Sequence, residues 1–215
     1  MTRPDVAYHV SFLCQFMKDP SPDAYEAGLG VLSYLNQTKD LGITYGGAPQ
    51  SRAEQDASST SAPVAFSDAS FGKTPYPWHG GVVLWRNGAV AWHARKLKIT
   101  VPDSTCMIEL YAINATLRET EFVANILEDM SVKVTTPHVI TDSKSALDII
   151  MNPGATKRSV HYERWLYFAR DAFLHNRARF FLFGTDKMMA DGMTKVVDRL
   201  KFFIIRTYIM NLGAI

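Results

Sequence analysis

The chain has 215 residues, of which 47% are hydrophobic and 20% are charged. These values are typical of a globular protein with a sizeable core and exclude a disordered or fibrous chain. Lys and Arg together number 23 and Asp and Glu 21, so the formal charge is only +2, and contacts with nucleic acid would have to come from local basic patches. The two cysteines, Cys14 and Cys106, lie far apart, which disfavours a disulfide scaffold or a zinc site and favours a reducing compartment.

Membrane insertion is not expected from the hydropathy of the chain. The most apolar stretch, 202–205, ends at Arg206, well short of the roughly 20 residues that cross a bilayer. Residues 1–5 contain no apolar signal region. We therefore expect no membrane partner and a cytoplasmic or nuclear location.

Residues 1–47 are expected to form a helical hairpin followed by a short strand. Apolar residues recur at helical spacing on both sides of a proline-rich turn at 19–22, where Ser21 is the expected N-cap and Pro22 the first residue of the second helix. The stretch 41–45 is typical of a short strand. A hairpin of this size buries too little apolar surface to fold alone, so we expect it to dock on another surface.

A linker is expected to divide the chain into two parts. Residues 48–62 are mostly small and polar, which is typical of a flexible connection between domains. The second domain is then expected to comprise residues 63–215.

Three strands are expected at the start of this second domain. The apolar run 64–70 predicts a short buried strand that carries Asp68. The dipeptide Asn87-Gly88 is a strong hairpin signal, because both residues accept the positive φ of a type I′ turn. The two β-prone stretches on either side of it are therefore expected to be antiparallel strands, 79–86 and 89–95.

The rest of the chain alternates helical patterns with two β-prone runs. Glu109 lies near the start of the longest helix, and Asp142 lies between a strand and a helix, which places it at the carboxyl edge of a sheet. Together with the first three strands, this order predicts a mixed five-stranded sheet flanked by helices. The expected elements are a helix that is N-capped within Asp103-Ser104-Thr105 and runs to about 128, a strand 137–141, a helix through 146–150, a helix 162–175, a strand 179–183, a helix begun by Thr185-Asp186 that holds Asp191, and a last helix 199–211.

Four acidic residues in apolar settings predict a metal site. Converging carboxylates repel one another unless a cation lies between them, and hard oxygen ligands suit Mg²⁺ or Mn²⁺. Taken singly, each acid has an ordinary explanation, because a lone Asp is most often a turn or cap residue and a lone helical Glu is most often solvated. The four candidates are Asp68, Glu109, Asp142 and Asp191.

With these acids in this order, the chain resembles the ribonuclease H domain of copia-type retrotransposon polyproteins. The N-terminal part, 2–45, is similar to the end of the reverse transcriptase that precedes that domain. The resemblance implies a ribonuclease H-like fold and an endonuclease that hydrolyses the RNA strand of RNA–DNA hybrids within a retrotransposon reverse-transcription machinery. The similar segments are Phe66-Ser67-Asp68-Ala69-Ser70, 88–92, Glu109-Leu110-Tyr111-Ala112, Thr141-Asp142-Ser143-Lys144-Ser145-Ala146 and 189–195.

The resemblance also implies roles for individual residues. Two Mg²⁺ or Mn²⁺ ions would be held by the four acids, with Asp68 bridging them, Glu109 and Asp142 on one ion and Asp191 on the other, although the sequence alone does not fix this partition. Ser143 and Lys144 are placed to contact a 2′-hydroxyl, by which RNA is distinguished from DNA. Basic clusters that could follow phosphates are Arg95-Lys96 with Lys98, Lys157-Arg158, and Lys195 with Arg199 and Lys201, and His161 matches a family histidine whose structural or catalytic role stays open.

The chain departs from the family pattern in ways that keep alternatives open. Cys106-Met107-Ile108 stands where the family has a further acid before the glutamate, and the polymerase signature is absent. The chain could therefore be a catalytically inactive, retroelement-derived remnant that binds nucleic acid or a polymerase partner. An integrase or transposase core is disfavoured, because its glutamate follows both aspartates whereas Glu109 precedes Asp142.

Overall fold

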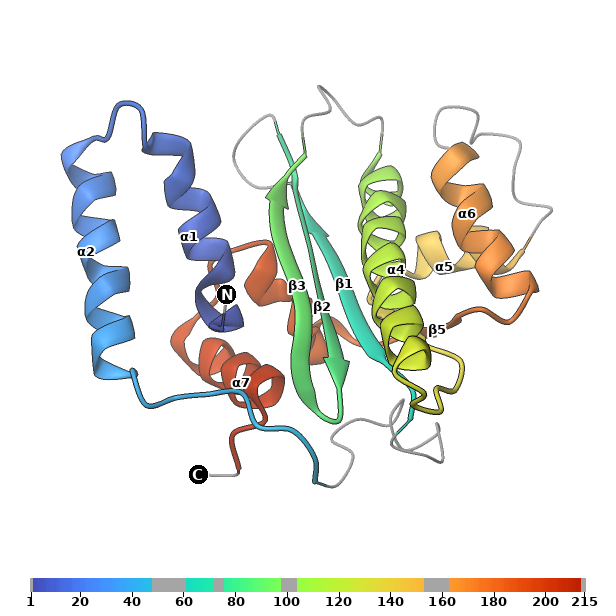
Figure 1. Cartoon of the computed structure of the whole chain (residues 1–215). Helices are drawn as coiled ribbons and strands as arrows, with labels where there is room; N and C mark the ends of the chain where they lie inside the picture. The colour runs from blue at the N-terminus through green and yellow to red at the C-terminus, as the bar shows by residue number, and fades with distance from the viewer. Residues whose placement is uncertain (1, 48–60, 72–75, 98–103, 153–162, 214–215) are drawn as a thin grey trace.

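The computed structural model describes residues 2–47, 61–71, 76–97, 104–152 and 163–213. In this part of the chain, five strands form one sheet in the order β3-β2-β1-β4-β5 (Figure 1). The first three strands are antiparallel neighbours, whereas β4 pairs parallel with β1, and β5 parallel with β4. The expected mixed five-stranded sheet is confirmed. The strands are β1 (Val64–Ser70), β2 (Trp78–Trp85), β3 (Gly88–Lys96), β4 (His138–Thr141) and β5 (Arg179–Leu182).

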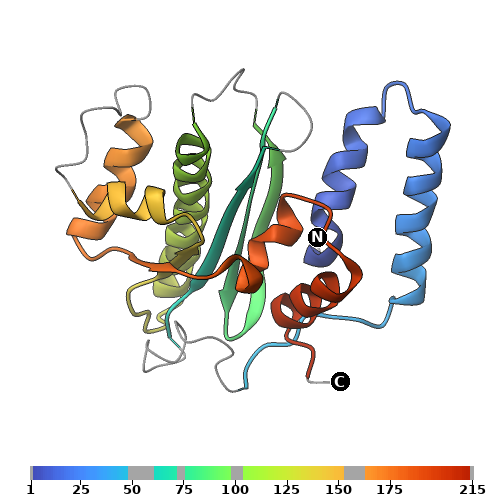
Figure 2. The ribbon, with the colours of Figure 1, turned by 180° about the vertical axis from the view of Figure 1, so that it is seen from behind.

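Helices cover both faces of the sheet, as Figures 1 and 2 show. One face carries α4 (Thr105–Asp129), α5 (Lys144–Met151) and α6 (Glu163–Leu174). The other face carries α7 (Arg199–Met210) and, against β3, α1 (Ala7–Leu13), beside which α2 (Pro22–Gln37) lies. Short 3₁₀ turns complete the described elements: η1 (Pro4–Val6), η2 (Cys14–Phe16), η5 (Thr185–Lys187) and η6 (Met189–Met193).

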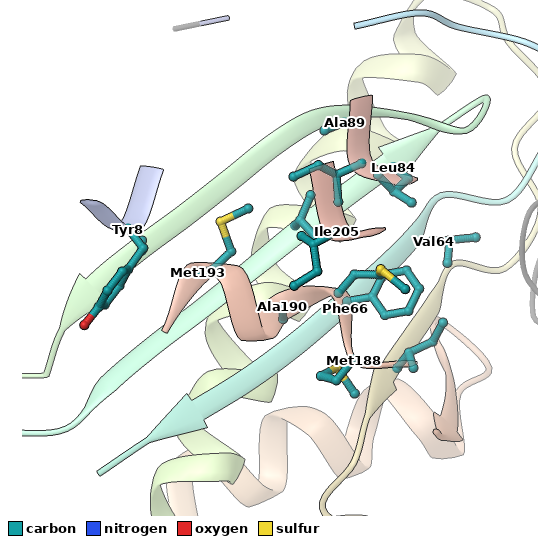
Figure 3. Close-up of a cluster of buried hydrophobic side chains, with 14 of the residues drawn as sticks. Tyr8, Val64, Phe66, Leu84, Ala89, Met188, Ala190, Met193 and Ile205 are labelled. Atoms are coloured by element: carbon teal, nitrogen blue, oxygen red, sulfur yellow. The ribbon is translucent and has the colours of Figure 1, made fainter. Parts of the chain in front are cut away.

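Two apolar cores lie on the two faces, because the pleat of each strand sends alternate side chains to opposite sides. Val64 and Phe66 of β1 pack with Ile205 of α7, and Figure 3 shows these side chains in one cluster with Met188 and Met193. Val139 of β4 faces the opposite way and packs with Leu110 of α4. The central strands β1, β2 and β4 are thus largely buried on both faces. Within the described ranges, no helix combines the length and the apolar character required to cross a bilayer.

Several local signals in the sequence act as expected. Ser21 caps α2, its hydroxyl accepting a hydrogen bond from the Ala24 amide, and Pro22 is the first residue of that helix. Ser104 caps α4 in the same way through the Met107 amide. Such caps depend only on residues three positions apart, which is why the sequence predicts them.

Three local predictions differ from the structure. The hairpin between β2 and β3 is present, but its two turn residues are Arg86, with φ 48°, and Asn87, with φ 67°. Gly88 instead begins β3, and a Cβ there would lie 2.6 Å from the Thr44 carbonyl oxygen.

Residues 41–45 are not a strand, since they are held by isolated hydrogen bonds such as that from the Thr44 amide to the Met210 carbonyl, at 2.9 Å. Residues 185–193 form the 3₁₀ turns η5 and η6 rather than an α-helix.

The N-terminal helices share contacts with the sheet and with α7. Tyr8 of α1 lies in the core, with its ring 5.1 Å from that of Trp78 in β2. Asp5, which is 5% exposed, pairs with Arg3 at 2.7 Å and accepts a hydrogen bond from the Tyr34 hydroxyl at 2.6 Å. The expected linker, 48–62, lies outside the described residues except for its last two, so the division into 1–47 and 63–215 stays a prediction.

Gly80 is expected to be required for the close approach of η6 to β2. A Cβ at Gly80 would lie 2.9 Å from the Met193 carbonyl oxygen, so Gly80→Ala should lower the free energy of unfolding by about 1–3 kcal/mol. The matched control is Gly30→Ala in α2, where a Cβ meets nothing within 4 Å and the helix should gain about 1 kcal/mol. Urea unfolding of both variants tests this. Equal stability of Gly80→Ala and the parent protein would contradict it.

Candidate active site

Three carboxylates meet at the carboxyl edge of the central strands. Asp68 lies in β1, Glu109 near the start of α4, and Asp142 directly after β4, and each offers one oxygen such that the three oxygens lie within 4.8 Å of one another. Phe66 and Ile140 are register partners in the parallel β1–β4 pair, so Asp68 and Asp142, each two residues further on, come side by side. The packing of α4 on β1 and β2 brings Glu109 to the same edge.

The surroundings of the three carboxylates are unequal. Asp68 is 2% exposed, and its Oδ2 accepts a hydrogen bond from the Thr194 hydroxyl. Asp142 accepts a hydrogen bond from the Thr185 hydroxyl at 2.8 Å. Oε2 of Glu109 is buried and has no hydrogen-bond partner among the described residues. A buried acceptor without a donor is costly, so this oxygen is suited to a ligand that carries positive charge.

Burial and mutual repulsion raise the pKa values of two of these acids. Burial, followed by the charges of Asp68 and Asp142, raises the pKa of Glu109 to about 9. Burial raises the pKa of Asp68 to about 7, although Lys195 and the Thr194 hydroxyl lower it. Asp68 and Glu109 therefore resist simultaneous ionisation near neutral pH. A bound cation would relieve that resistance.

Asp191 lies apart from this group of three. Its side chain is fully buried, with Oδ1 2.6 Å from the Lys195 ammonium and Oδ2 paired with the Lys201 ammonium. The Lys195 ammonium also lies 3.7 Å from Asp68 Oδ2. The structure thus brings three of the four expected acids together and joins the fourth to them through a lysine. The assignment of all four as metal ligands stays a prediction.

The residues expected to bind substrate are Ser143 and Lys144, which directly follow Asp142, and Arg95 and Lys96, at the end of β3. Ser143 caps α5, its hydroxyl accepting a hydrogen bond from the Ala146 amide at 3.3 Å, and Lys144 is exposed in the first turn. At the end of β3, Arg95 lies 3.8 Å from Glu119, and the Lys96 ammonium donates to the Gln15 side chain at 2.7 Å. Outside the described residues lie His161, Lys98, Lys157 and Arg158.

From the sequence alone, Lys195 and Lys201 are expected only as contacts to phosphates of the nucleic acid. Thr194 and Lys195 follow Asp191 by three and four positions, and in a helical turn this spacing places all three side chains on one face. The pairing of Lys195 with Asp191 could therefore have been predicted from the sequence. Lys201 belongs to α7, and its pairing with Asp191 depends on how α7 packs against η6. No spacing rule predicts that contact.

Comparison with known proteins shows that the chain is similar in sequence to transposon polyproteins. No family model matches it. It is 27% identical over 205 residues to a retrovirus-related Pol polyprotein from transposon RE2 of Arabidopsis thaliana, covering 94% of the chain and 13% of that protein. The chain is a relative of retrotransposon Pol polyproteins. The resemblance expected from the sequence is confirmed.

Two further relatives come from other organisms. The Pol polyprotein from transposon TNT 1-94 of Nicotiana tabacum is 27% identical, covering 94% of the chain and 14% of that protein. The transposon Ty1-ER2 Gag-Pol polyprotein of Saccharomyces cerevisiae is 24% identical, covering 89% of the chain and 11% of that protein. The chain thus spans between 11% and 14% of the length of these relatives.

Solved structures with a similar backbone are RNase H domains. An RNase H1 isolated from compost has a TM-score of 0.49 at 14% identity, and the match covers 62% of the present chain and 93% of the RNase H1. The N-terminal RNase H domain of a Mycobacterium tuberculosis protein has a TM-score of 0.42 at 18% identity, and the match covers 62% of the present chain and 91% of that domain's chain.

The raised pKa of Glu109 predicts a pH dependence of stability in metal-free buffer. Because the pKa of Glu109 in the folded protein is about 9 rather than 4.5, stability present at acidic pH should fall as the pH rises towards 9. Glu109→Gln should remove this loss and be more stable than the parent at pH 9 by on the order of 1 kcal/mol or more. Urea unfolding between acidic and alkaline pH with a chelator measures the effect.

The control for this experiment is Glu128→Gln, which changes an exposed glutamate at the other end of α4 and should leave the pH profile unchanged. Parallel profiles for the parent and Glu109→Gln would show that Glu109 ionises without cost.

Proposed function

We propose that the chain is a metal-dependent endonuclease of the ribonuclease H type that hydrolyses the RNA strand of RNA–DNA hybrids during retrotransposon reverse transcription. The observation that carries the proposal is the convergence of Asp68, Glu109 and Asp142 from three separate elements to within 4.8 Å. The relatedness to Pol polyproteins supports the same activity. The order of the acids along the chain favours this reaction over that of an integrase core.

The residues at this edge fit a hard divalent cation. Three carboxylates, one of them with a buried oxygen that lacks a donor, offer the oxygen ligands that Mg²⁺ and Mn²⁺ prefer. Such ions, when bound, would make a water molecule nucleophilic and neutralise the charge that develops on the phosphate. Asp68, Glu109 and Asp142 would hold the metal. The expected second ion, beside Asp191, stays a prediction.

The substrate side of the site is assigned to residues next to these acids. Lys144 is exposed in the first turn of α5, directly after Asp142 and Ser143, where it could contact the RNA strand close to the scissile phosphate. A 2′-hydroxyl beside Ser143 and Lys144 would let the site distinguish RNA from DNA. Arg95 and Lys96, at the end of β3, would follow phosphates of the hybrid further from the acids.

Loss of one carboxylate should abolish cleavage without unfolding the protein. Asp68→Asn should lower the rate of cleavage of a labelled RNA–DNA hybrid in Mg²⁺ or Mn²⁺ by at least about 10²-fold, because one charged metal ligand is removed. Asp148→Asn changes an exposed acid on α5 and should cleave at the parental rate. Cleavage by Asp68→Asn at the parental rate would overturn the assignment.

The same assay separates this proposal from the alternative of an inactive remnant. Hybrid binding by the parent protein, without cleavage in either metal, would favour the remnant. The replacement of the family's further acid by Cys106-Met107-Ile108 is the feature that favours that alternative.

We also infer that the N-terminal helices dock a polymerase domain of the same polyprotein. An apolar groove of about 670 Å³ runs between α1 with η2 on one side and α2 on the other. Its lining is exposed in the isolated chain, with Tyr25 62%, Leu32 63% and Met17 77% exposed. An apolar surface of this kind is typical of a protein–protein contact, and the resemblance of residues 2–45 to the end of a reverse transcriptase indicates the partner.

A charge placed in the groove should weaken this association. Leu32→Lys should reduce binding to the separately produced polymerase segment of the polyprotein by about 10-fold or more, because the charge would have to be desolvated. Asn36→Lys adds the same charge to an exposed position of α2 outside the lining and should bind as the parent does. Equal binding of all three proteins in a titration would exclude the groove as the contact.

A further inference from the structure

The Lys195 ammonium occupies a defined place between two acids of the site. It lies 2.6 Å from Oδ1 of Asp191 and 3.7 Å from Oδ2 of Asp68. Under the assignment of ligands expected from the sequence, Asp68 and Asp191 are the two acids that would flank a second divalent ion. The place that such an ion would need is therefore already taken by a positive charge from the chain itself.

The backbone around Asp191 holds Lys195 in this position. The amides of Thr194 and Lys195 donate to the Asp191 carbonyl at 3.2 and 3.1 Å, which folds the segment back over Asp191. The Thr194 hydroxyl donates to Asp68, so the same turn is tied to β1. Lys195 thus reaches both acids from a turn that is joined to each of them.

Lys201 pairs with the other carboxylate oxygen of Asp191. Its ammonium pairs with Oδ2 of Asp191 and donates to the Thr185 carbonyl at 2.8 Å. Both oxygens of Asp191 therefore face ammonium groups, and the side chain is fully buried. A divalent ion that used Asp191 as a ligand would have to displace at least one of these lysines.

The charges at the site balance with a single divalent ion. When all four carboxylates are ionised, as a bound divalent ion would favour, they and the ammonium groups of Lys195 and Lys201 leave two negative charges, which one Mg²⁺ or Mn²⁺ neutralises. Buried groups of like charge are unfavourable without such compensation. A second divalent ion would leave a net positive charge in a largely buried place.

We propose that Lys195 serves as the second cation of this site, so that the protein without substrate binds one divalent ion, held by Asp68, Glu109 and Asp142. The inference rests on the proposed metal-dependent function and specifies how many ions the site holds. The Lys195 side chain is 39% exposed, so a phosphate oxygen of a bound strand could reach its ammonium. Lys195 would then supply to the phosphate the positive charge that a second ion supplies in a two-ion site.

Counting bound Mn²⁺ tests the inference without an activity measurement. Equilibrium dialysis of the parent protein against Mn²⁺ should give one bound ion, and electron paramagnetic resonance should show a magnetically isolated ion. Two ions about 3.5–4 Å apart would instead give an exchange-coupled spectrum. Two bound, coupled ions in the parent protein would overturn the inference, whatever the variants do.

Variants of Lys195 make the test specific to its charge. Lys195→Met should raise the number of bound Mn²⁺ ions from one to two, because Asp68 and Asp191 lose the ammonium between them. Lys195→Arg keeps the positive charge and should bind one ion, as should Lys187→Met, which removes an exposed lysine of η5. A count of one for Lys195→Met, with its fold verified by circular dichroism, would also overturn the inference.

Failure of this inference and failure of the proposed function give different results. If the parent protein cleaves the hybrid and binds two ions, the nuclease proposal stands and the role of Lys195 falls. If Asp142→Asn binds Mn²⁺ as tightly as the parent does, the three-carboxylate site itself is wrong.

Discussion

The repulsion between carboxylates at one edge of the sheet is the constraint on which this structure depends. Asp68, Glu109 and Asp142 are held within 4.8 Å of one another, and burial already disfavours the charge of Asp68 and Glu109. Such an arrangement persists only when the rest of the fold imposes it. The hydroxyls of Thr185 and Thr194 and the Lys195 ammonium reduce its cost, and a divalent ion would reduce it further.

The sheet imposes this arrangement through its central parallel pair. The register of β1 against β4 places Asp68 beside Asp142, and the packing of α4 across β1 and β2 adds Glu109. Gly80 of β2, the register partner of Asp68, leaves room for η6 to approach, and η6 contains Asp191. The site is therefore built from rigid elements whose apolar faces are buried in the two cores, which is what a preorganised polar site requires.

The C-terminal segment and the N-terminal helices are linked to the same framework. α7 packs on the face of the sheet opposite α4, and its Lys201 reaches Asp191 at the edge. Arg206 of α7 donates to the Tyr34 hydroxyl, which in turn donates to Asp5 of η1. α1 and α2 are thus joined to the helix that positions one lysine of the site, while the groove between them stays exposed.

Much of the fold and part of the site followed from the sequence, because those features depend on residues that are close along the chain. Caps such as Ser21 and Ser104, the β2–β3 hairpin and the acids at the ends of apolar runs are local patterns. Only the tertiary structure decided that η5 and η6 are 3₁₀ turns, that Arg86 rather than Gly88 occupies the hairpin turn, and that Asp191 faces Lys195 and Lys201. These outcomes depend on the packing of segments distant in sequence, where steric fit and the pairing of buried charges outweigh local preference.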